Sequence, residues 1–391
     1  MTYQFDAVVD RSGNHSAKYD ERKKKFGTED VIPLWIADMD FKTAQPIIDA
    51  LKARAEEGIW GYTARPDSYF EAIRGWQKRR NGWDIDQSLM SFSLGVVQTL
   101  SACVKLFTPE GGSVLIQTPV YSEFYDMTEA WNRKVLENQF VEKDGKWTVD
   151  WADFEEKLKQ ADLFLLCSPH NPLGHVWTEE ELRRMMELCL KHHVLVVSDE
   201  IHSDLIMPGH KHVAFANACK DALPKYLVCT APSKTFNLAT LQTSNIVIPD
   251  EELRTKFQSI LQQHFTPSAG ALGLEACRLG YTECEGWLAE VIDLIYKNYK
   301  NFCKFIDVNC PGVTYSDLQG TYLMWIDCTT FGLDDEALDK LLRKHDLFCD
   351  AGTLFSQGGT MHTRVNLAGP EKMLNAAMQR FKDAYDEAKN A

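Results

Sequence analysis

The chain alternates apolar, β-rich runs with segments of helical pattern between residues 89 and 248, and this alternation restricts its possible folds more than any other feature. The β-rich runs are LMSFSL, SVLIQ, KVLENQF, DLFLLC, VLVVSD, YLVCT and SNIVI. Between them, Gly95 precedes the helical segment VVQTLSACVKLF, and Thr178 with Glu181 forms a capping box before ELRRMMELCLKHH. Strands that alternate with helices are typical of a parallel sheet with helices on both faces. We therefore predict an α/β fold with a mostly parallel, seven-stranded sheet.

The pattern changes after about residue 285, which indicates a second region. The long amphipathic segment WLAEVIDLIYKNYKNFCKFI is followed by the strand-like run YLMWID and by a terminal helix from Pro370. We predict a smaller α+β domain at residues 286–391 and a large domain at residues 45–285. The segment 1–44 has too little apolar surface to fold alone, so we expect it to pack with the small domain.

The composition argues against several classes of partner. The chain has 42 Lys and Arg against 56 Asp and Glu, a formal net charge of -14, which is unfavourable for binding nucleic acid or anionic membranes. No apolar run approaches the roughly 18 residues of a membrane-spanning helix, and the start MTYQFDAVVDRSGN lacks the apolar region of a signal peptide. The eleven cysteines include no CxxC pair or other metal-ligand spacing, so we expect reduced thiols, a cytoplasmic location and no metal site.

Residues that directly follow the β-rich runs are candidates for chemistry, because ligands of such sheets bind at the carboxyl ends of the strands. Five sites of this kind are Gly95–Val97, Tyr121, Asn171, Asp199 and Lys234. Each of them alone has an ordinary structural explanation. Because all five follow successive strands of one domain, their order favours a shared site.

Lys234 and Asp199 are the charged members of this set. Lys234 follows YLVCT beside Ser233, where a partly desolvated amine has a lowered pKa and can form an imine with an aldehyde. The alternative is a surface lysine. Asp199 ends the very hydrophobic run VLVVSD, where a buried carboxylate needs a cationic partner. A protonated pyridine nitrogen is such a partner and makes a cofactor ring an electron sink; the alternative is a helix N-cap.

Gly95 and its neighbours suit a phosphate group. Gly95 begins a helix, so the backbone N–H groups of Val96 and Val97 can point toward a phosphate with the helix dipole behind them. Ser233 can add its hydroxyl to the same phosphate. One glycine alone is a weak signal.

Asn171 and Tyr121 suit an aromatic ring that carries a hydroxyl. Asn171, in the turn SPHNPLG, can donate its amide to a phenolate oxygen, and Tyr121, in TPVY, can stack on a flat heteroaromatic ring. The alternatives are an ordinary NPxG loop for Asn171 and a core aromatic for Tyr121.

The motifs around these residues resemble those of one enzyme superfamily. In this order, SLGVV, TPVY, SPHNPLG, SDEIH and APSKTFN are similar to motifs of fold-type I pyridoxal-phosphate (PLP) enzymes of the class I/II aminotransferase superfamily. More narrowly, PLWIADMDF, GYT, SPHNPLGHVWT, VSDEIHSDLIMPGH and TAPSKTFNLA resemble the MalY/PatB group of carbon-sulfur lyases, which includes cystalysin. The resemblance runs nearly end to end. It implies an aspartate aminotransferase-like fold with a PLP-binding large domain, and PLP as the cofactor.

The resemblance also implies a role for each candidate residue. Lys234 holds the cofactor covalently, Asp199 contacts its pyridine nitrogen, Asn171 its O3′ oxygen and Tyr121 its ring face. Tyr62, in GYT, reaches the phosphate of the neighbouring subunit's cofactor. The chain is therefore expected to form a homodimer with shared active sites.

Two residues are expected to bind substrate, and two others depart from the aminotransferase pattern. Arg364, in TRVNLA, matches the arginine that binds the substrate α-carboxylate, a role that suits a planar bidentate fork. Ala37, in PLWIADMDF, is the second expected substrate contact. His202, an expected cofactor contact, replaces a tyrosine common in aminotransferases, and Gln242 replaces a phosphate-binding arginine. Both replacements fit the lyase branch.

Three more departures bear on substrate preference. Thr240 replaces a glycine that usually follows FNLA, and the sequence GGTMHTR places Met361 and His362 next to Arg364. We expect His362 to be a structural histidine.

Together these features predict an α,β-elimination from a small sulfur-containing amino acid. Lys234 takes the Cα proton, Arg364 holds the carboxylate, and a thiolate leaves Cβ before pyruvate and ammonia are released. Tyr121 and Lys234 are alternative proton donors to the sulfur. The nearest alternative is an aminotransferase of the same fold. A non-enzymatic regulatory protein is a second alternative, against which the intact Lys234, Asp199 and Arg364 argue.

Overall fold

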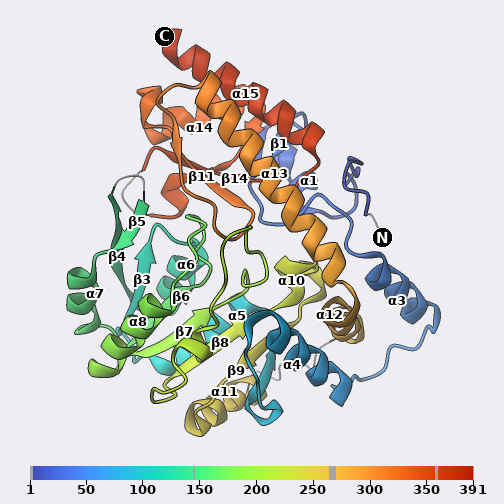
Figure 1. Cartoon of the computed structure of the whole chain (residues 1–391), viewed down its shortest axis with the longest axis vertical. Helices are drawn as coiled ribbons and strands as arrows, with labels where there is room; N and C mark the ends of the chain where they lie inside the picture. The colour runs from blue at the N-terminus through green and yellow to red at the C-terminus, as the bar shows by residue number, and fades with distance from the viewer. Residues whose placement is uncertain (1–2, 144–145, 264–269, 357–359, 391) are drawn as a thin grey trace.

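An eight-stranded sheet forms the centre of the computed structural model, which describes residues 3–143, 146–263, 270–356 and 360–390 (Figure 1). The strand order is β2-β9-β8-β7-β6-β3-β4-β5. The strands are β2 (Met90–Ser93), β3 (Ser113–Thr118), β4 (Lys134–Lys143), β5 (Lys146–Val149), β6 (Leu163–Cys167), β7 (Leu195–Asp199), β8 (Tyr226–Thr230) and β9 (Ser244–Val247). Neighbours from β4 to β8 run parallel, whereas the pairs β2–β9, β8–β9 and β4–β5 are antiparallel.

The predicted α/β fold is confirmed, with one strand more than predicted. All seven predicted strands are present, and β5 adds an eighth at the edge. This strand was not predicted, because three of its four residues are exposed or half-buried and it therefore has no apolar run. Gly95 is the N-cap residue of α5 (Val96–Phe107), and the predicted capping box of Thr178 and Glu181 begins α8 (Glu179–Lys191).

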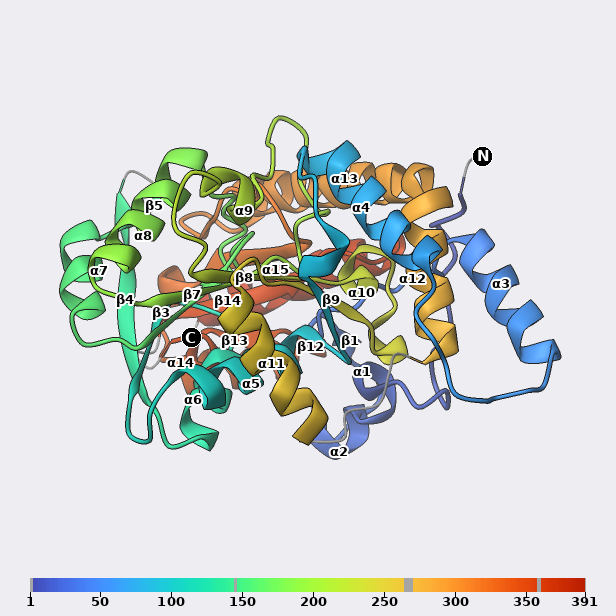
Figure 2. The ribbon, with the colours of Figure 1, turned by 90° about the horizontal axis from the view of Figure 1, so that it is seen from below.

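Helices cover both faces of the large sheet, as Figure 2 shows. One layer contains α5, α6 (Glu123–Ala130) and α11 (Glu251–Gln263). The opposite layer contains α4 (Asp67–Asn81), α7 (Trp151–Leu158), α8 and α12 (Ala271–Glu283). Successive residues of β6 point into different layers: Leu163 and Leu165 pack with α5, whereas Phe164 and Leu166 join the cluster that includes α8. Burial on both faces explains why these strands read as continuous apolar runs.

A smaller antiparallel sheet follows the large one in the chain. Its order is β10 (Thr314–Tyr315), β11 (Leu323–Asp327), β14 (His362–Asn366) and β13 (Asp350–Ala351). Beside it run α13 (Glu285–Asn309) and α15 (Glu371–Asn390), which pack against each other, with α14 (Asp335–Lys344) next to α15 (Figure 1).

The N-terminal segment pairs with the C-terminal part of the chain through β1 (Ile32–Pro33) and β12 (Leu347–Phe348). Its short helices are α1 (Ala17–Asp20) and α2 (Arg22–Phe26), and α3 (Gln45–Glu56) follows. The division into residues 1–44, 45–285 and 286–391 stays a prediction, because one cluster of buried side chains continues from the large sheet to α13 and α15.

Three further observations concern the cysteines, the helices and groups of possible metal ligands. All eleven cysteines are buried free thiols. Within the described ranges, no helix is both long and apolar enough to cross a membrane, and no group of three His, Cys, Asp or Glu residues is arranged to hold a metal ion.

Candidate active site

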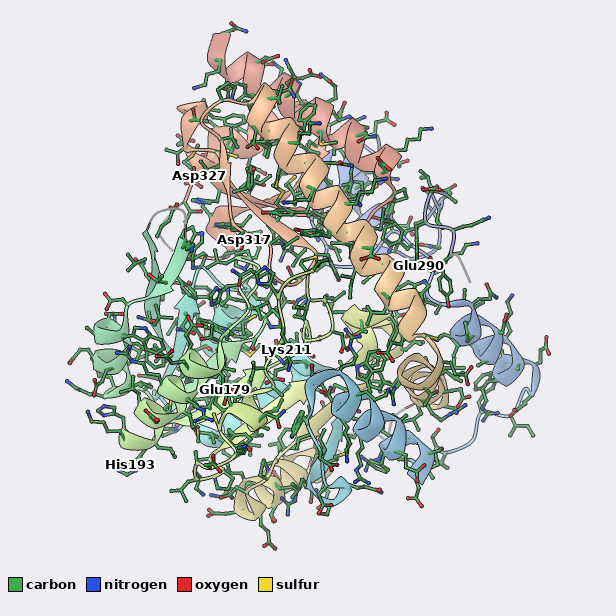
Figure 3. All side chains as sticks on the ribbon, viewed as in Figure 1. Glu179, His193, Lys211, Glu290, Asp317 and Asp327 are labelled. Atoms are coloured by element: carbon green, nitrogen blue, oxygen red, sulfur yellow. The ribbon has the colours of Figure 1, made fainter. Side chains whose placement is uncertain are left out.

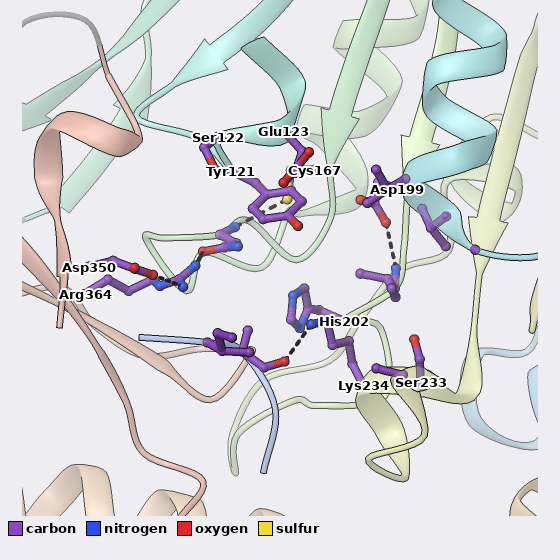
Figure 4. A pocket seen from close by; sticks show the side chains of 18 of the residues that line it. Tyr121, Ser122, Glu123, Cys167, Asp199, His202, Ser233, Lys234, Asp350 and Arg364 are labelled. Carbon is purple, nitrogen blue, oxygen red and sulfur yellow. Dashed lines mark hydrogen bonds and ion pairs between the residues drawn. The ribbon is translucent and has the colours of Figure 1, made fainter. Parts of the chain in front are cut away.

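A cavity of about 450 Å³ lies at the carboxyl ends of the central strands, between the large and small sheets. It brings together nearly all residues that the sequence singled out. The predicted residues on its wall are Ala37, Gly95, Val96, Val97, Tyr121, Asn171, Asp199, His202, Ser233, Lys234 and Arg364. Figure 4 shows how the polar side chains among them point into the cavity.

Lys234 lies in the short helix α10 (Pro232–Thr235), directly after β8. Its Nζ donates a hydrogen bond to the carbonyl of Ala37 at 2.6 Å. Burial, together with the nearby positive charge of Arg364, lowers the pKa of Lys234 to about 8. A buried amine with this pKa is available as a nucleophile or base near neutral pH.

Asp199 ends β7 and is buried with its carboxylate toward the cavity. Its Oδ1 accepts a hydrogen bond from the backbone N–H of Ile201 at 3.1 Å. Burial raises the pKa of Asp199 to about 7, against the weaker opposing effects of that hydrogen bond and of Lys234. Because no Lys, Arg or His among the described residues forms an ion pair with it, the carboxylate can serve a cationic ligand.

The N-terminus of α5 and the ring of Tyr121 form two further walls. Gly95, Val96 and Val97 place the start of α5 against the cavity, where backbone N–H groups favour an anion. Ser233 lines the cavity from the side of α10. Tyr121 follows β3 and is anchored through its backbone N–H, which donates to the carbonyl of Asn171 at 3.1 Å.

Arg364 enters the cavity from β14 of the small sheet. Its guanidinium donates to Oδ1 of Asn171 at 3.0 Å and to the carbonyl of Trp35 at 2.8 Å. It also lies over the ring of Phe355, 4.8 Å from the ring centroid. Its Nε has no hydrogen-bond partner among the described residues. A buried guanidinium with a donor to spare is suited to bind a carboxylate.

Asp350 forms a buried ion pair with Arg364, which faces it directly across β13 and β14. Burial raises the pKa of Asp350, while the adjacent guanidinium of Arg364 opposes that rise. Asp350 therefore compensates the charge of Arg364 before a ligand arrives.

Comparison with known proteins agrees with this geometry. Residues 29–381 match the family model for aminotransferase class I and II. The chain is 40% identical over 383 residues to cystathionine beta-lyase PatB of Bacillus subtilis, which covers 97% of this chain and 99% of PatB. It is 30% identical to protein MalY of Escherichia coli, over 95% of this chain and 96% of MalY. The structure of cystalysin from Treponema denticola, which contains pyridoxal 5′-phosphate, superposes with a TM-score of 0.95 at 35% identity, covering 99% and 100% of the two chains.

The chain belongs to the aminotransferase class I and II family. The resemblance that the motifs indicated is thereby confirmed, both for this family and for the narrower group that includes PatB, MalY and cystalysin.

Four residues that the sequence singled out do not line the active-site cavity. Tyr62 is fully exposed, in the segment between α3 and α4, so its expected contact with another subunit stays a prediction. His362 precedes Arg364 by two residues but lines a different cavity. Met361 and Thr240 are also absent from the residues that line the active-site cavity, whereas Gln242 is among them.

Several residues that shape the active-site cavity were not among those expected from the sequence. Asp350 is the main one, and its only signal is that it follows the short apolar run LFC. The segment 35–38 is held at successive carbonyls by Arg364, Asn366 and Lys234. No local pattern reveals these contacts, since they join positions about 200 to 330 residues apart.

Proposed function

We propose that this chain is a PLP-dependent carbon-sulfur β-lyase that converts a sulfur amino acid into a thiol or sulfide, pyruvate and ammonia. The observation that carries the proposal is the convergence of Lys234, Asp199 and Arg364 on one cavity. The lyase name of PatB and the PLP bound to cystalysin support this chemistry and this cofactor.

The donor set of the cavity fits PLP. Asp199 is a buried carboxylate without an ion-pair partner among the described residues, and it would hold the pyridine nitrogen. The N–H groups at the start of α5 and the hydroxyl of Ser233 would hold the phosphate. When bound, PLP supplies an aldehyde that bonds to amines and a ring that withdraws electrons from the substrate Cα.

Tyr121, Asn171 and His202 would complete the cofactor site. Tyr121 and Asn171 come from connections after β3 and β6, and the Nδ1 of His202 is buried without a hydrogen-bond partner among the described residues. Burial, followed by the charges of Lys234 and Arg364, lowers the pKa of His202 well below its usual value. A neutral imidazole and the amide of Asn171 would both contact the hydroxyl side of the ring.

Lys234 would hold the cofactor and also transfer protons. With a pKa of about 8, part of its amine is neutral near physiological pH, so it can accept the proton from the substrate Cα. Arg364 would fix the α-carboxylate, which orients the Cα–H and Cβ–S bonds for elimination. Lys234 and Tyr121 both border the cavity and are candidates to protonate the departing sulfur.

The charges around the cavity disfavour a substrate whose side chain carries a net negative charge. The described lining residues include two cations, Lys234 and Arg364, both already assigned to roles. Asp350 and Glu123 add negative charge, and the remaining wall is largely apolar, with Trp35, Ile36, Leu354 and Phe355. This environment suits a thioether side chain without net charge, including the zwitterionic end of cystathionine, better than the side chain of aspartate or glutamate, because an anionic side chain has no cationic partner there.

We also propose that the protein acts as a cytoplasmic homodimer in which Tyr62 completes the partner's cofactor site. Buried free thiols, as in all eleven cysteines here, are typical of a reducing compartment. The exposed apolar side chains around Tyr62 support an interface at that segment.

Replacement of Lys234 tests the proposal. The purified wild-type protein should be yellow, and borohydride should fix PLP to the peptide that contains Lys234. Lys234→Ala should lose that bond and lower thiol release by about 10³-fold or more, as expected when an acid-base group is removed. Lys211→Ala, at an exposed position labelled in Figure 3, is the control and should change neither property. A Lys234→Ala protein that still forms the reducible bond would refute the assignment.

A further inference from the structure

A second cavity lies between the small sheet and the β4–β5 hairpin. Its volume is about 240 Å³, and it shares no lining residue with the active-site cavity. The residues that line it are Glu142, Trp147, Thr314, Tyr315, Ser316, Trp325, Asp327 and His362.

The residues of one wall of this cavity lie on a single face of the small sheet, as the register of its strands shows. Asp327 lies opposite Thr314 on one side and opposite His362 on the other. Trp325 lies two residues before Asp327 and therefore points to the same face. Trp147, from β5, approaches this face with its ring centroid 6.1 Å from that of His362.

Aromatic rings form much of the wall. His362 stacks on Trp325, with ring centroids 5.0 Å apart and an interplanar angle of 15°. Trp147 meets His362 at 66°, so two indole rings and one imidazole border the cavity. Because Trp325 is covered by His362, the half-buried ring of Trp147 is the one that can attract an organic cation through its electron-rich face.

Two polar atoms in this wall have no hydrogen-bond partner among the described residues: Nε1 of Trp325 and Oγ of Ser316. Trp325 is 1% exposed and Ser316 is 4% exposed. A buried N–H without an acceptor is costly, and native proteins contain few of them. A ligand oxygen in the cavity would supply the missing acceptor.

The ionised side chains that line the cavity are carboxylates. Glu142 and Asp327 contribute them, and the described lining includes no Lys or Arg. Asp327 uses Oδ1 to accept from the backbone N–H of Thr329 at 2.7 Å, which leaves its other oxygen for a ligand. Figure 3 shows Asp327 at the end of the small sheet that is nearest to β5.

We propose that this cavity is a second ligand site, for a small organic cation that carries a nearby oxygen acceptor. The carboxylates of Glu142 and Asp327 and the ring of Trp147 hold the positive charge, and the oxygen accepts from Nε1 of Trp325. The site is independent of PLP chemistry, so its ligand binds whether or not the elimination reaction takes place.

Choline is the probe that tests this site, because its quaternary ammonium cannot form an imine with PLP and its hydroxyl is an acceptor. Calorimetric titration of the PLP-loaded protein should give saturable binding of one choline per chain. Its neutral isostere 3,3-dimethylbutan-1-ol should bind at least about fivefold more weakly, the ratio expected for a loss of roughly 1 kcal/mol.

Three substitutions locate the binding. Asp327→Asn, which keeps the oxygen that caps Thr329, should weaken choline binding about fivefold. Trp325→Phe should weaken it about threefold, because it keeps an aromatic ring but removes the donor. Glu142→Gln, at an exposed position, gives a third test if the buried Trp325 variant does not fold. Asp317→Asn is the control, since Asp317 is exposed, adjacent to Ser316 and not part of the lining.

Three results would overturn the proposal. They are the absence of saturable choline binding, equal binding of the neutral isostere, and choline affinity that neither Asp327→Asn nor Glu142→Gln changes.

Discussion

Arg364 is held in place before any substrate arrives. Asn171, Trp35 and Asp350 accept its hydrogen bonds, and Phe355 supports its plane. We expect Arg364→Ala to lower kcat/KM about 10²-fold, because the clamp that orients the substrate is lost. Arg364→Lys should recover only part of this loss, since an ammonium lacks the planar fork. Steady-state kinetics with a sulfur amino acid measures both effects, and full activity of the alanine variant would contradict the role.

Asp199 should make the cofactor-free protein less stable at high pH. Its pKa is about 7 in the folded protein against an ordinary value of 3.8, so the folded state binds the proton more tightly. Stability therefore falls as the pH rises from about 4 to about 7. Asp199→Asn should raise the Tm of the cofactor-free protein by a few °C at pH 8 and change it little near pH 4. A thermal melt with equal Tm values at pH 8 would show that the buried charge is otherwise compensated.

The expected residues that line the cavity include polar side chains that directly follow a long apolar strand. Asp199 and Lys234 are such cases. Each lies at the carboxyl end of a buried central strand, where ligands of such sheets bind. Asp350 follows only a short apolar run. Its role as the ion-pair partner of Arg364 depends on the position of Arg364, which lies opposite it in β14. Pairings of this kind are tertiary, so the sequence alone did not reveal them.

At the scale of elements, seven of the eight strands of the large sheet were predictable and their order was not. Burial on both faces gave each central strand a continuous apolar run. The edge strand β5, and β1 and β12 with two residues each, have no such pattern. The antiparallel direction of β9 depends on its neighbours β2 and β8, which lie far away in the sequence.

The segment between α3 and α4 carries three large exposed side chains: Ile59 at 74%, Trp60 at 56% and Tyr62 at 111% relative exposure. So much apolar surface in four residues is typical of an interface. We expect a homodimer in sedimentation experiments and a faster loss of PLP on dialysis from Tyr62→Phe than from the wild type. A fully active monomer would contradict this expectation.

In the whole molecule, three distant parts of the chain meet at one cavity. The large sheet supplies Lys234 and Asp199, the small sheet supplies Arg364, and the N-terminal segment closes the wall at Ala37. Since the motifs of the sequence lie at these contacts, the family was recognisable from the sequence. The contacts that fix the N-terminal segment, such as the buried ion pair of Lys18 and Asp40 at 2.6 Å, emerged only from the fold.

The most direct test of the lyase assignment is to incubate the PLP-loaded protein with L-cystathionine and to measure pyruvate and released thiol, with and without a keto acid. The proposal predicts equal amounts of pyruvate and thiol, and little effect of the keto acid. If cystathionine gives no pyruvate while the keto acid is rapidly aminated by an amino donor, the protein is an aminotransferase and the lyase assignment is wrong.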